Sequence, residues 1–442
     1  MTDAGQTYAS PSSMMDIRIV AATPQQEVMA NLREGAEWHG PLMTPRQYLE
    51  REAHLVDSAL SRDGRRQKWV MVPPTAEPGT LDFLASCETH RRPMLVLKPG
   101  HSEPCRAVVY SICSVVVPPD KRKRGYASLM MTLLHQHLSS TGRVPFPTFG
   151  EQVSGQDGPT TAWEQDPALL DARHDGDSSS AGDATASFLY SDIGDFYEAF
   201  EWKRAESRHV EWQVQDGAAG GTSSSSSPAA VAPRWLTADE LVDIAQLDRK
   251  LLLRTFARAA ETIGSQGQKI RFAIDDPEAR AWRWRIERDN FTARFADPPL
   301  ANRPTRYGVI LGGGDGGGTA DGPAYAAWTY DAAHRQLKLL RLQFETAAQF
   351  RTLVDLLKGE AQQHGMRSIE AWNVDLAKLG IAIDQPTQAR LWKGEKVAFE
   401  RELAGGELVE RDDVHLPSVA WYGERRGGQH VEWLLNEYGW YI

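Results

Sequence analysis

Cysteine is scarce, with three residues in a chain of 442. Cys87, Cys105 and Cys113 are too few for a disulfide framework, and none lies in a CxxC or a mixed Cys/His spacing that holds zinc. The sequence therefore predicts a reducing compartment and no metal site.

Long apolar runs are also missing. No stretch approaches the ~18 consecutive apolar residues of a membrane-spanning helix. Residues 1–16 lack the basic start and apolar core of a secretory signal, and the final residues carry no lipidation or peroxisomal motif. We expect a cytoplasmic protein with no membrane partner, and a nuclear location is also compatible with the sequence.

An excess of positive charge is absent as well. The chain has 49 basic and 59 acidic residues, a formal net charge of −10. Such a chain has no overall attraction for nucleic acid or anionic lipid, and a polyanionic ligand would need a local positive site. We expect no nucleic-acid partner.

The length suggests two or three domains at roughly 150 residues each. Residues 216–233 contain no aromatic residue and a single charge, the composition of a flexible linker, which predicts one domain over 1–215 and another over 234–442. A polar, low-complexity region predicts a disordered insertion over about 150–186. The glycine-rich residues 312–322 predict the loop of a β-hairpin.

In the first domain, hydrophobic periodicity predicts a strand, two helices, three strands, a helix, a strand, a helix and a strand. The strands are expected at 17–21, 68–72, 83–88, 107–117, 187–190 and 209–214, and the helices at 24–35, 45–58, 125–138 and 192–200. This order indicates an α/β (α+β) domain built around a mostly antiparallel sheet.

The most informative segment joins strand 107–117 to helix 125–138. Four consecutive basic residues, 121–124, precede Gly125 at the start of that helix. Backbone N–H groups at a helix start have no helical partner, and the helix dipole adds positive charge there. Gly125 allows close approach of a ligand and Ala127 is small. The segment predicts an anion site, although a solvated surface turn remains the alternative.

The spacing Arg122-x-x-Gly125-x-Ala127 resembles the acetyl-CoA pyrophosphate signature R/Q-x-x-G-x-G/A of the Gcn5-related N-acetyltransferase (GNAT) superfamily. The order of elements is similar to that fold, and residues 196–202 (FYEAFEW) resemble its later motif F/Y-Y-E-x-x-G-F/W, with Glu201 where glycine is usual. The resemblance implies acetyl-CoA as co-substrate and direct transfer in a ternary complex. The implied cofactor-binding residues are Val115, Val116, Val117, Arg122, Lys123, Arg124, Gly125, Tyr126 and Ala127. Residues 114–117 should splay or bulge, so that free backbone groups pair with the pantetheine arm.

Four further segments, 37–52, 84–93, 189–202 and 431–442, resemble fungal acetyltransferases that act on the side-chain amine of lysine. This narrower resemblance implies free L-lysine as the small-molecule acceptor, and a product, N6-acetyllysine, that feeds lysine degradation. The sequence does not determine the oligomeric state.

Acetylation needs a neutral amine, and a lysine side chain with a pKa of about 10.4 is mostly protonated at neutral pH. A base must therefore accept a proton. In several relatives this base is a glutamate 14 residues before the turn glycine, where this chain has Ser111. Glu88, slightly preferred, and Asp192 are the candidate bases, and Glu88 is equally compatible with an ordinary carboxylate at a strand end.

The departing thiolate needs a proton donor. The resemblance to the later motif implies Tyr197 as general acid, and a buried structural tyrosine is the alternative. Trp38, His39 and Tyr48 are expected to line the acceptor side, and the alternative is packed aromatic side chains and a surface histidine. An α-carboxylate would be held by a fixed arginine or a helix N-terminus, which the sequence does not identify.

The second half partly repeats the first. A helix is expected at 238–251, strands at 324–330, 336–341 and 368–372, and a helix at 347–363. Residues 343–346 (QFET), where the phosphate-binding turn would stand, contain no glycine and no basic residue. This predicts a degenerate GNAT-like domain that binds no CoA and supplies a wall of the acceptor cleft, or only a scaffold.

The sequence thus predicts an enzyme that moves the acetyl group of acetyl-CoA to the N6 amine of free L-lysine. The alternatives are a protein-lysine or polyamine N-acetyltransferase and a non-catalytic acyl-CoA-binding module.

Overall fold

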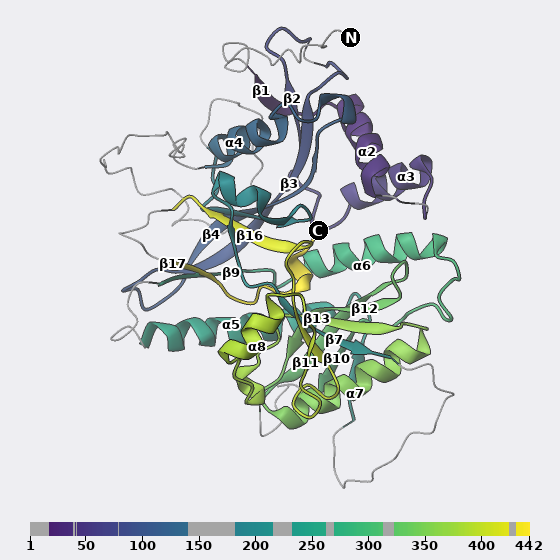
Figure 1. Ribbon diagram of the computed structural model, residues 1–442, viewed down its shortest axis with the longest axis vertical. Coiled ribbons are helices and arrows are strands. Elements are labelled where there is room, and N and C mark those ends of the chain that lie inside the picture. The colour runs from purple at the N-terminus through teal and green to yellow at the C-terminus, as the bar shows by residue number, and fades with distance from the viewer. Residues whose placement is uncertain are drawn as a thin grey trace.

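The computed structural model describes residues 17–38, 40, 42–77, 79–139, 182–214, 232–261, 269–312, 322–423 and 430–442. Two mixed β-sheets, each flanked by helices, make up the two halves of the molecule (Figure 1). The predicted α/β fold is confirmed.

The first sheet has the order β1-β2-β3-β4-β5-β16-β6, with β9 paired to β3 and β17 paired to β9. Within it, β4 and β5 are parallel, as are β9 and β17, and the other pairs are antiparallel. The strands are β1 (Arg18–Ala21), β2 (Arg66–Val72), β3 (Ala85–Leu97), β4 (Cys105–Val116), β5 (Ala186–Ser191), β6 (Lys203–Arg204), β9 (Lys269–Ile274), β16 (Leu416–Trp421) and β17 (His430–Trp433).

Helices cover both faces of this sheet. Helix α4 (Tyr126–Leu138) buries Met130 and Leu134 against one face, together with Cys87 of β3. On the other side lie α2 (Pro24–Trp38), α3 (Pro45–Val56) and α6 (Arg280–Thr292), and Trp284 of α6 is packed with Phe188 of β5 (Figure 1). The helices expected at 24–35, 45–58 and 125–138 are confirmed as α2, α3 and α4. The short helix expected at 192–200 is a 3-10 helix, η4 (Gly194–Phe200).

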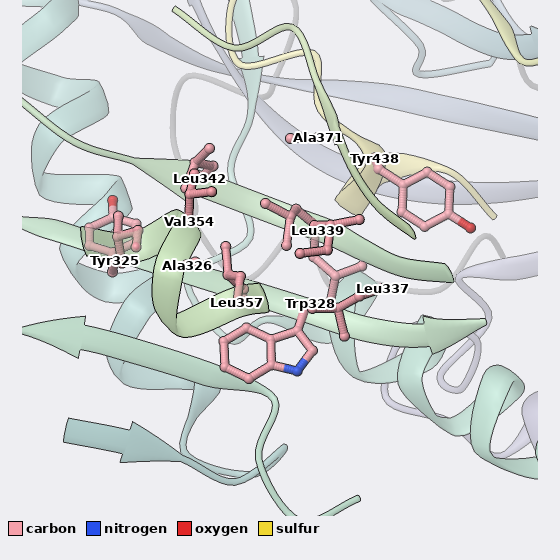
Figure 2. Packing of buried hydrophobic residues seen from close by; sticks show 14 of the residues in the cluster. Tyr325, Ala326, Trp328, Leu337, Leu339, Leu342, Val354, Leu357, Ala371 and Tyr438 are labelled. Atoms are coloured by element: carbon pink, nitrogen blue, oxygen red, sulfur yellow. The ribbon is translucent and has the colours of Figure 1, made fainter. Parts of the chain in front are cut away.

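The second sheet has the order β14-β15-β7-β13-β12-β11-β10-β8. Its strands are β7 (Arg208–Gln213), β8 (Arg234–Leu236), β10 (Gly308–Leu311), β11 (Ala324–Asp331), β12 (Gln336–Gln343), β13 (Ser368–Trp372), β14 (Val397–Ala398) and β15 (Glu407–Glu410), and its helices are α5 (Leu241–Glu261), α7 (Ala347–Gln363) and α8 (Gln385–Leu391). Trp328 of β11, Leu337 and Leu339 of β12, and Val354 and Leu357 of α7 form part of its core (Figure 2).

The two halves exchange strands, which the sequence did not indicate. Strand β7, expected to close the first sheet, pairs instead with β13 and β15 of the second. Strand β16, from the C-terminal half, pairs with β5 and β6 of the first. Residues 216–231 of the linker expected at 216–233 lie outside the described residues. The strands on either side of it, β7 and β8, belong to the same sheet, so the boundary between the two sheets does not fall there. Strand periodicity shows which face is buried but not which neighbour a strand pairs with.

Strand β3 is longer than the expected 83–88. Its second half, Met94–Leu97, pairs with β4 on one side and with β9 on the other. Arg91, Arg92 and Pro93 interrupt the apolar pattern, so the sequence did not predict that the strand continues. In the structure, hydrogen bonds to the two neighbouring strands extend β3 beyond these residues.

Residues 150–181 of the insertion expected over about 150–186 lie outside the described residues. Its last part belongs to the ordered fold, because the Asp183 carboxylate accepts hydrogen bonds from Arg91 (2.7 Å) and Tyr110 (2.8 Å). Among the helices that the structure describes, none is long and apolar enough to cross a membrane.

Candidate active site

The first sheet opens between β4 and β5. Their parallel pairing runs from Val109 and Ala186 to Ile112 and Leu189 and then stops, although β4 continues to Val116. The strands separate towards the carboxyl end of β4, where backbone groups on the facing edges are left without ladder partners.

A β-bulge in β4 lies beside this opening. Glu88 pairs with Cys113 and Ser86 with Val116, so β4 carries one extra residue between the two pairs. Ser114 takes up the extra length with a φ of 54°. The irregularity expected at 114–117 is confirmed, and it turns this segment out of the regular ladder.

The opening leads into the predicted anion-binding turn. A short 3-10 helix, η1 (Pro119–Lys121), follows β4, and Lys123 and Gly125 have left-handed φ values of 62° and 80°. Helix α4 begins at Tyr126 with no side-chain cap. Because a helix start leaves its first N–H groups without intrahelical partners, this uncapped turn presents backbone donors to an anion.

The basic side chains of the turn are mostly engaged in holding its shape. Lys121 lies 2.6 Å from Asp82. Arg122 donates to the Val117 carbonyl at 3.0 Å and forms an ion pair with Glu37 of α2. Arg124 donates to the Asp120 carbonyl at 3.2 Å. Lys123 is exposed, and its ammonium has no hydrogen bond or ion pair with another described residue.

Tyr197 lies in η4, 8% exposed, with its ring centroid 5.1 Å from that of Phe196. Burial, with a contribution from the charge of Asp192, raises the pKa of Tyr197 well above its ordinary value. The 3-10 helix ends at Glu201, whose φ of 71° is left-handed. Glu201 thus adopts the backbone conformation that the motif's usual glycine favours, so its side chain does not alter the turn.

Asp192 follows the end of β5. Its side chain is 43% exposed, and its carboxylate accepts a hydrogen bond from the backbone N–H of His415 at 2.9 Å. Because it interacts electrostatically with Tyr197, the candidate acid and this candidate base belong to one neighbourhood.

Glu88 has a different setting. Its carboxylate is buried, and its Oε2 lies 2.7 Å from Arg66 Nη2 and 2.9 Å from Lys68 Nζ. Lys68 Nζ also lies 2.7 Å from the Glu34 carboxylate. Burial alone would raise the pKa of Glu88, but Lys68 and Arg66 outweigh it and hold the pKa well below its ordinary value. A carboxylate so tightly paired is a weak proton acceptor. Of the two candidates, the geometry favours Asp192.

Ser111, at the position where relatives carry the base, pairs directly with His90 of β3. His90 is fully buried, 3.5 Å from Glu88, and neither ring nitrogen has a hydrogen-bond partner. Sequence reasoning missed His90 because β3 was expected to end at Glu88. The alternation that buries Glu88 on one face places His90 on the same face once the strand is extended.

Glu88, His90 and Cys113 form one group whose ligand atoms lie within 4.8 Å of one another, as a metal site requires. However, Glu88 already neutralises Arg66 and Lys68, so a divalent ion would lie beside two fixed positive charges. This arrangement disfavours a metal.

The residues expected on the acceptor side have unlike surroundings. Trp38, at the end of α2, is 48% exposed. Tyr48 of α3 is buried, with the Arg51 guanidinium 4.4 Å from its ring centre. His39 lies outside the described residues.

The second sheet has a similar opening that is filled by the chain itself. The parallel pairing of β12 and β13 ends at Lys338 and Glu370, although β12 continues to Gln343. There the Glu437 carboxylate accepts the Leu342 N–H at 3.0 Å, and Tyr438 packs near Leu339 (Figure 2).

The helix that follows β12 has a closed N-terminus. Thr346 and Gln349 form a complete capping box at the start of α7. Its first N–H groups are therefore partly satisfied, unlike those of α4.

A cavity of about 1580 Å³ lies between the two halves. Arg204 and Trp421 line it from the first sheet, and Arg341, Asn373 and Glu437 line it from the second half. The C-terminal half thus contributes a wall to the space between the sheets.

The chain is similar in sequence to known proteins. A family model described as the LYC1 GNAT-like C-terminal domain matches residues 219–442, half of the chain. The curated "Lysine acetyltransferase" of Yarrowia lipolytica is 24% identical over 351 residues, which cover 74% of this chain and 76% of that protein.

Solved structures with a similar arrangement include a GCN5-related N-acetyltransferase from Anabaena variabilis, 12% identical, covering 92% of this chain and 73% of that one with a TM-score of 0.44. Another is the tandem GNAT protein of the clavulanic acid biosynthesis pathway, 13% identical, covering 93% and 99% of the two chains with a TM-score of 0.40. The chain belongs to the LYC1-like family of GNAT proteins and is an N-acetyltransferase.

Proposed function

We propose that the protein transfers the acetyl group of acetyl-CoA to the N6 amine of free L-lysine by direct attack in a ternary complex. The observation that carries this proposal is the opening between β4 and β5, which leads into the uncapped start of α4. An extended arm that ends in a diphosphate fits an open strand edge followed by unpaired helix N–H groups.

In this proposal the pantetheine arm lies along residues 115–117, and the diphosphate is bound by the backbone of Arg122–Ala127. The left-handed φ of Gly125 and the small Ala127 keep side-chain bulk away from the phosphates. Lys123 supplies a mobile positive charge, whereas Arg122 is held by Val117 and Glu37 and shapes the turn.

The lysine amine attacks the thioester carbonyl carbon, a C–N bond forms, and the C–S bond breaks. Asp192 accepts the proton that the amine loses, directly or through water, and its exposed side chain can pass that proton to solvent. Glu88 remains a second candidate for this role.

Tyr197 donates a proton to the departing CoA thiolate. Its raised pKa keeps the phenol protonated at neutral pH. The burial that raises the pKa of the phenol also raises the pKa of a CoA thiol formed beside it. The departing thiolate is therefore a stronger base there and accepts a proton more readily.

Free lysine is proposed as acceptor because the curated relative is named a lysine acetyltransferase and aligns with most of the chain. Cytoplasmic localisation and a role in lysine degradation stay predictions from the sequence.

Calorimetry with acetyl-CoA, followed by a thiol-release assay, tests the proposal. Free L-lysine, a polyamine and a basic peptide serve as acceptors. We expect thiol release with free lysine above the other two. A preference for the peptide or the polyamine would replace the proposed acceptor, and binding of acetyl-CoA without thiol release would indicate a non-catalytic module.

A further inference from the structure

The described residues include five buried arginines: Arg51, Arg92, Arg285, Arg341 and Arg411. Three of them are paired with carboxylates, since Arg51 lies 2.7 Å from Glu52, Arg285 3.0 Å from Asp289, and Arg341 2.7 Å from Asp248. A buried charge without a partner is costly, so the other two need an explanation.

Arg92 keeps one hydrogen bond and lies beside a small cavity. Its Nη1 donates to the Trp440 carbonyl at 3.2 Å, whereas its Nε and Nη2 have no hydrogen-bond partner among the described residues. Arg92 and Asp276 both line a cavity of about 10 Å³. That volume suits one water molecule, which would join the guanidinium to the carboxylate.

Arg411 has no comparable explanation. Within the part of the chain that the structure describes, none of its three guanidinium nitrogens has a hydrogen-bond partner, and the residue is 7% exposed. The guanidinium lies 3.6 Å from the ring centre of Trp372, and burial lowers the pKa of Arg411 to about 10.

Two carboxylates interact with Arg411 electrostatically, but both are engaged elsewhere. Trp372 Nε1 donates to Glu370 at 2.5 Å, and Arg208 Nε donates to Glu410 at 3.0 Å. Neither lies within ion-pair distance of the Arg411 guanidinium among the contacts of the described chain.

The surroundings of Arg411 connect it with the proposed reaction centre. Its loop is joined to the residues after β5, because His415 N–H donates to Asp192 at 2.9 Å and Gly194 N–H donates to the Asp413 carbonyl at 3.2 Å. Arg411 also interacts electrostatically with Tyr190, which follows the last residue of β5 that pairs with β4.

We propose that the Arg411 guanidinium, stacked on Trp372, binds the carboxylate of the acceptor amino acid, and this rests on the proposed function. A planar guanidinium held by an aromatic face offers two parallel N–H donors to a carboxylate. The acceptor class is therefore an α-amino acid with a side-chain amine, and a diamine of equal length lacks the group that Arg411 recognises.

The test compares kcat/KM for L-lysine and for 1,5-diaminopentane, which has a terminal amine on the same carbon chain but no carboxylate. Wild-type protein should prefer lysine. Arg411→Met keeps much of the side-chain volume without the charge, and it should lower kcat/KM for lysine by about 10- to 100-fold, as expected for lost charged hydrogen bonds, with little change for the diamine.

Arg411→Lys should retain part of the preference for lysine, because it keeps the positive charge. Arg92→Met is the matched control. It removes a second buried arginine and should change kcat/KM for lysine and for the diamine by the same factor. Because the Arg411 guanidinium has no hydrogen-bond or ion-pair partner among the described residues, Arg411→Met should not lower the melting temperature, whereas the upward shift that lysine gives in the wild type should disappear.

Two outcomes would overturn the inference. In the first, wild-type protein releases thiol with lysine, but Arg411→Met lowers kcat/KM equally for lysine and the diamine, or for neither. Arg411 then does not bind the carboxylate, and the proposed function stands. If wild-type protein releases no thiol with lysine, the proposed function fails and this inference fails with it.

Discussion

The ring centre of Tyr190, at the end of β5, lies 5.5 Å from the ring centre of Trp372, at the end of β13. Each residue lies just beyond the point where the parallel pairing of its own sheet stops, at Leu189 and at Glu370. The two sheets therefore meet where each one opens. Because the opening in the second sheet holds Glu437 and leads to a capped helix, we infer that acetyl-CoA binds in the first sheet alone.

Gly125→Glu should weaken acetyl-CoA binding at least a hundredfold. The substitution sets bulk and negative charge against the diphosphate, and a like-charge contact costs several kcal/mol. Calorimetry with acetyl-CoA measures the change. Gly100→Glu is the control, because Gly100 has a similar φ of 81° with open space around it, and it should leave binding unchanged. Equal affinities in both variants would refute the turn assignment.

Tyr197→Phe should reduce kcat by about 10²- to 10⁴-fold, the usual contribution of a general acid, while acetyl-CoA affinity changes little. Tyr307→Phe removes another hydroxyl, which donates to Asn290 at 3.0 Å in the second half, and it should keep the wild-type rate. Steady-state thiol release measures both variants. A wild-type rate for Tyr197→Phe would remove this residue from the mechanism.

Asp192→Asn and Glu88→Gln distinguish the two candidate bases. Asp192→Asn should lower kcat about a hundredfold or more with a near-normal melting temperature, because the side chain is partly exposed. Glu88→Gln should mainly destabilise the fold, by roughly 3–5 kcal/mol, because Lys68 and Arg66 lose a buried counter-ion. A stable Glu88→Gln protein with a hundredfold lower rate would reverse the assignment.

Acetyl-CoA should bind once per chain. Thr346→Ala removes the cap of α7 and should cost about 1 kcal/mol of stability without creating a second site, because Glu437 still fills the opening before the helix. Calorimetric stoichiometry and urea unfolding test the two parts. Two molecules of acetyl-CoA per wild-type chain would contradict the closed state of the second sheet.

Glu437 should make stability depend on pH. Burial outweighs Arg341 and raises the pKa of Glu437 to about 7 from an ordinary value of 4.5. The folded chain then holds this proton more tightly than the unfolded chain, so the contribution to the free energy of unfolding falls as pH rises from about 4.5 to about 7.

Glu437→Gln does not titrate. Relative to wild type, its free energy of unfolding should rise by up to about 3 kcal/mol between pH 4.5 and pH 8. Urea unfolding at the two pH values measures the difference. Parallel pH profiles for variant and wild type would show that Glu437 is already ionised at low pH.

Much of the fold was predictable because its signals are local. The apolar spacing in α4 and α7, the proline and threonine at the start of α3, and the hairpin of β10 and β11 all follow from neighbouring residues. The turn before α4 was predictable for the same reason, since strand, basic run, glycine and helix are contiguous, and its binding of a phosphate stays a prediction.

The candidate site was harder to predict where it depends on distant segments. Glu88 looked like a free carboxylate at a strand end, and only the folded chain surrounds it with Arg66 and Lys68. Arg411 lies more than 200 positions from Tyr190, and no local sequence pattern distinguishes it from the exposed arginines of the chain. Its burial without a hydrogen-bond partner among the described residues therefore could not be predicted.

The sequence by itself determined α2, α3, α4, α5 and α7 and the strand beside the turn, because these depend on residues within hydrogen-bonding reach along the chain. Helices α6 and α8 were not predicted, and anion binding by the turn stays a prediction. The tertiary structure decided that β7 and β16 exchange sheets, that Glu437 fills the second opening, and which charges are paired. Strand partners and buried ion pairs join residues far apart in sequence, and their free energy depends on packing and desolvation that exist only in the folded chain.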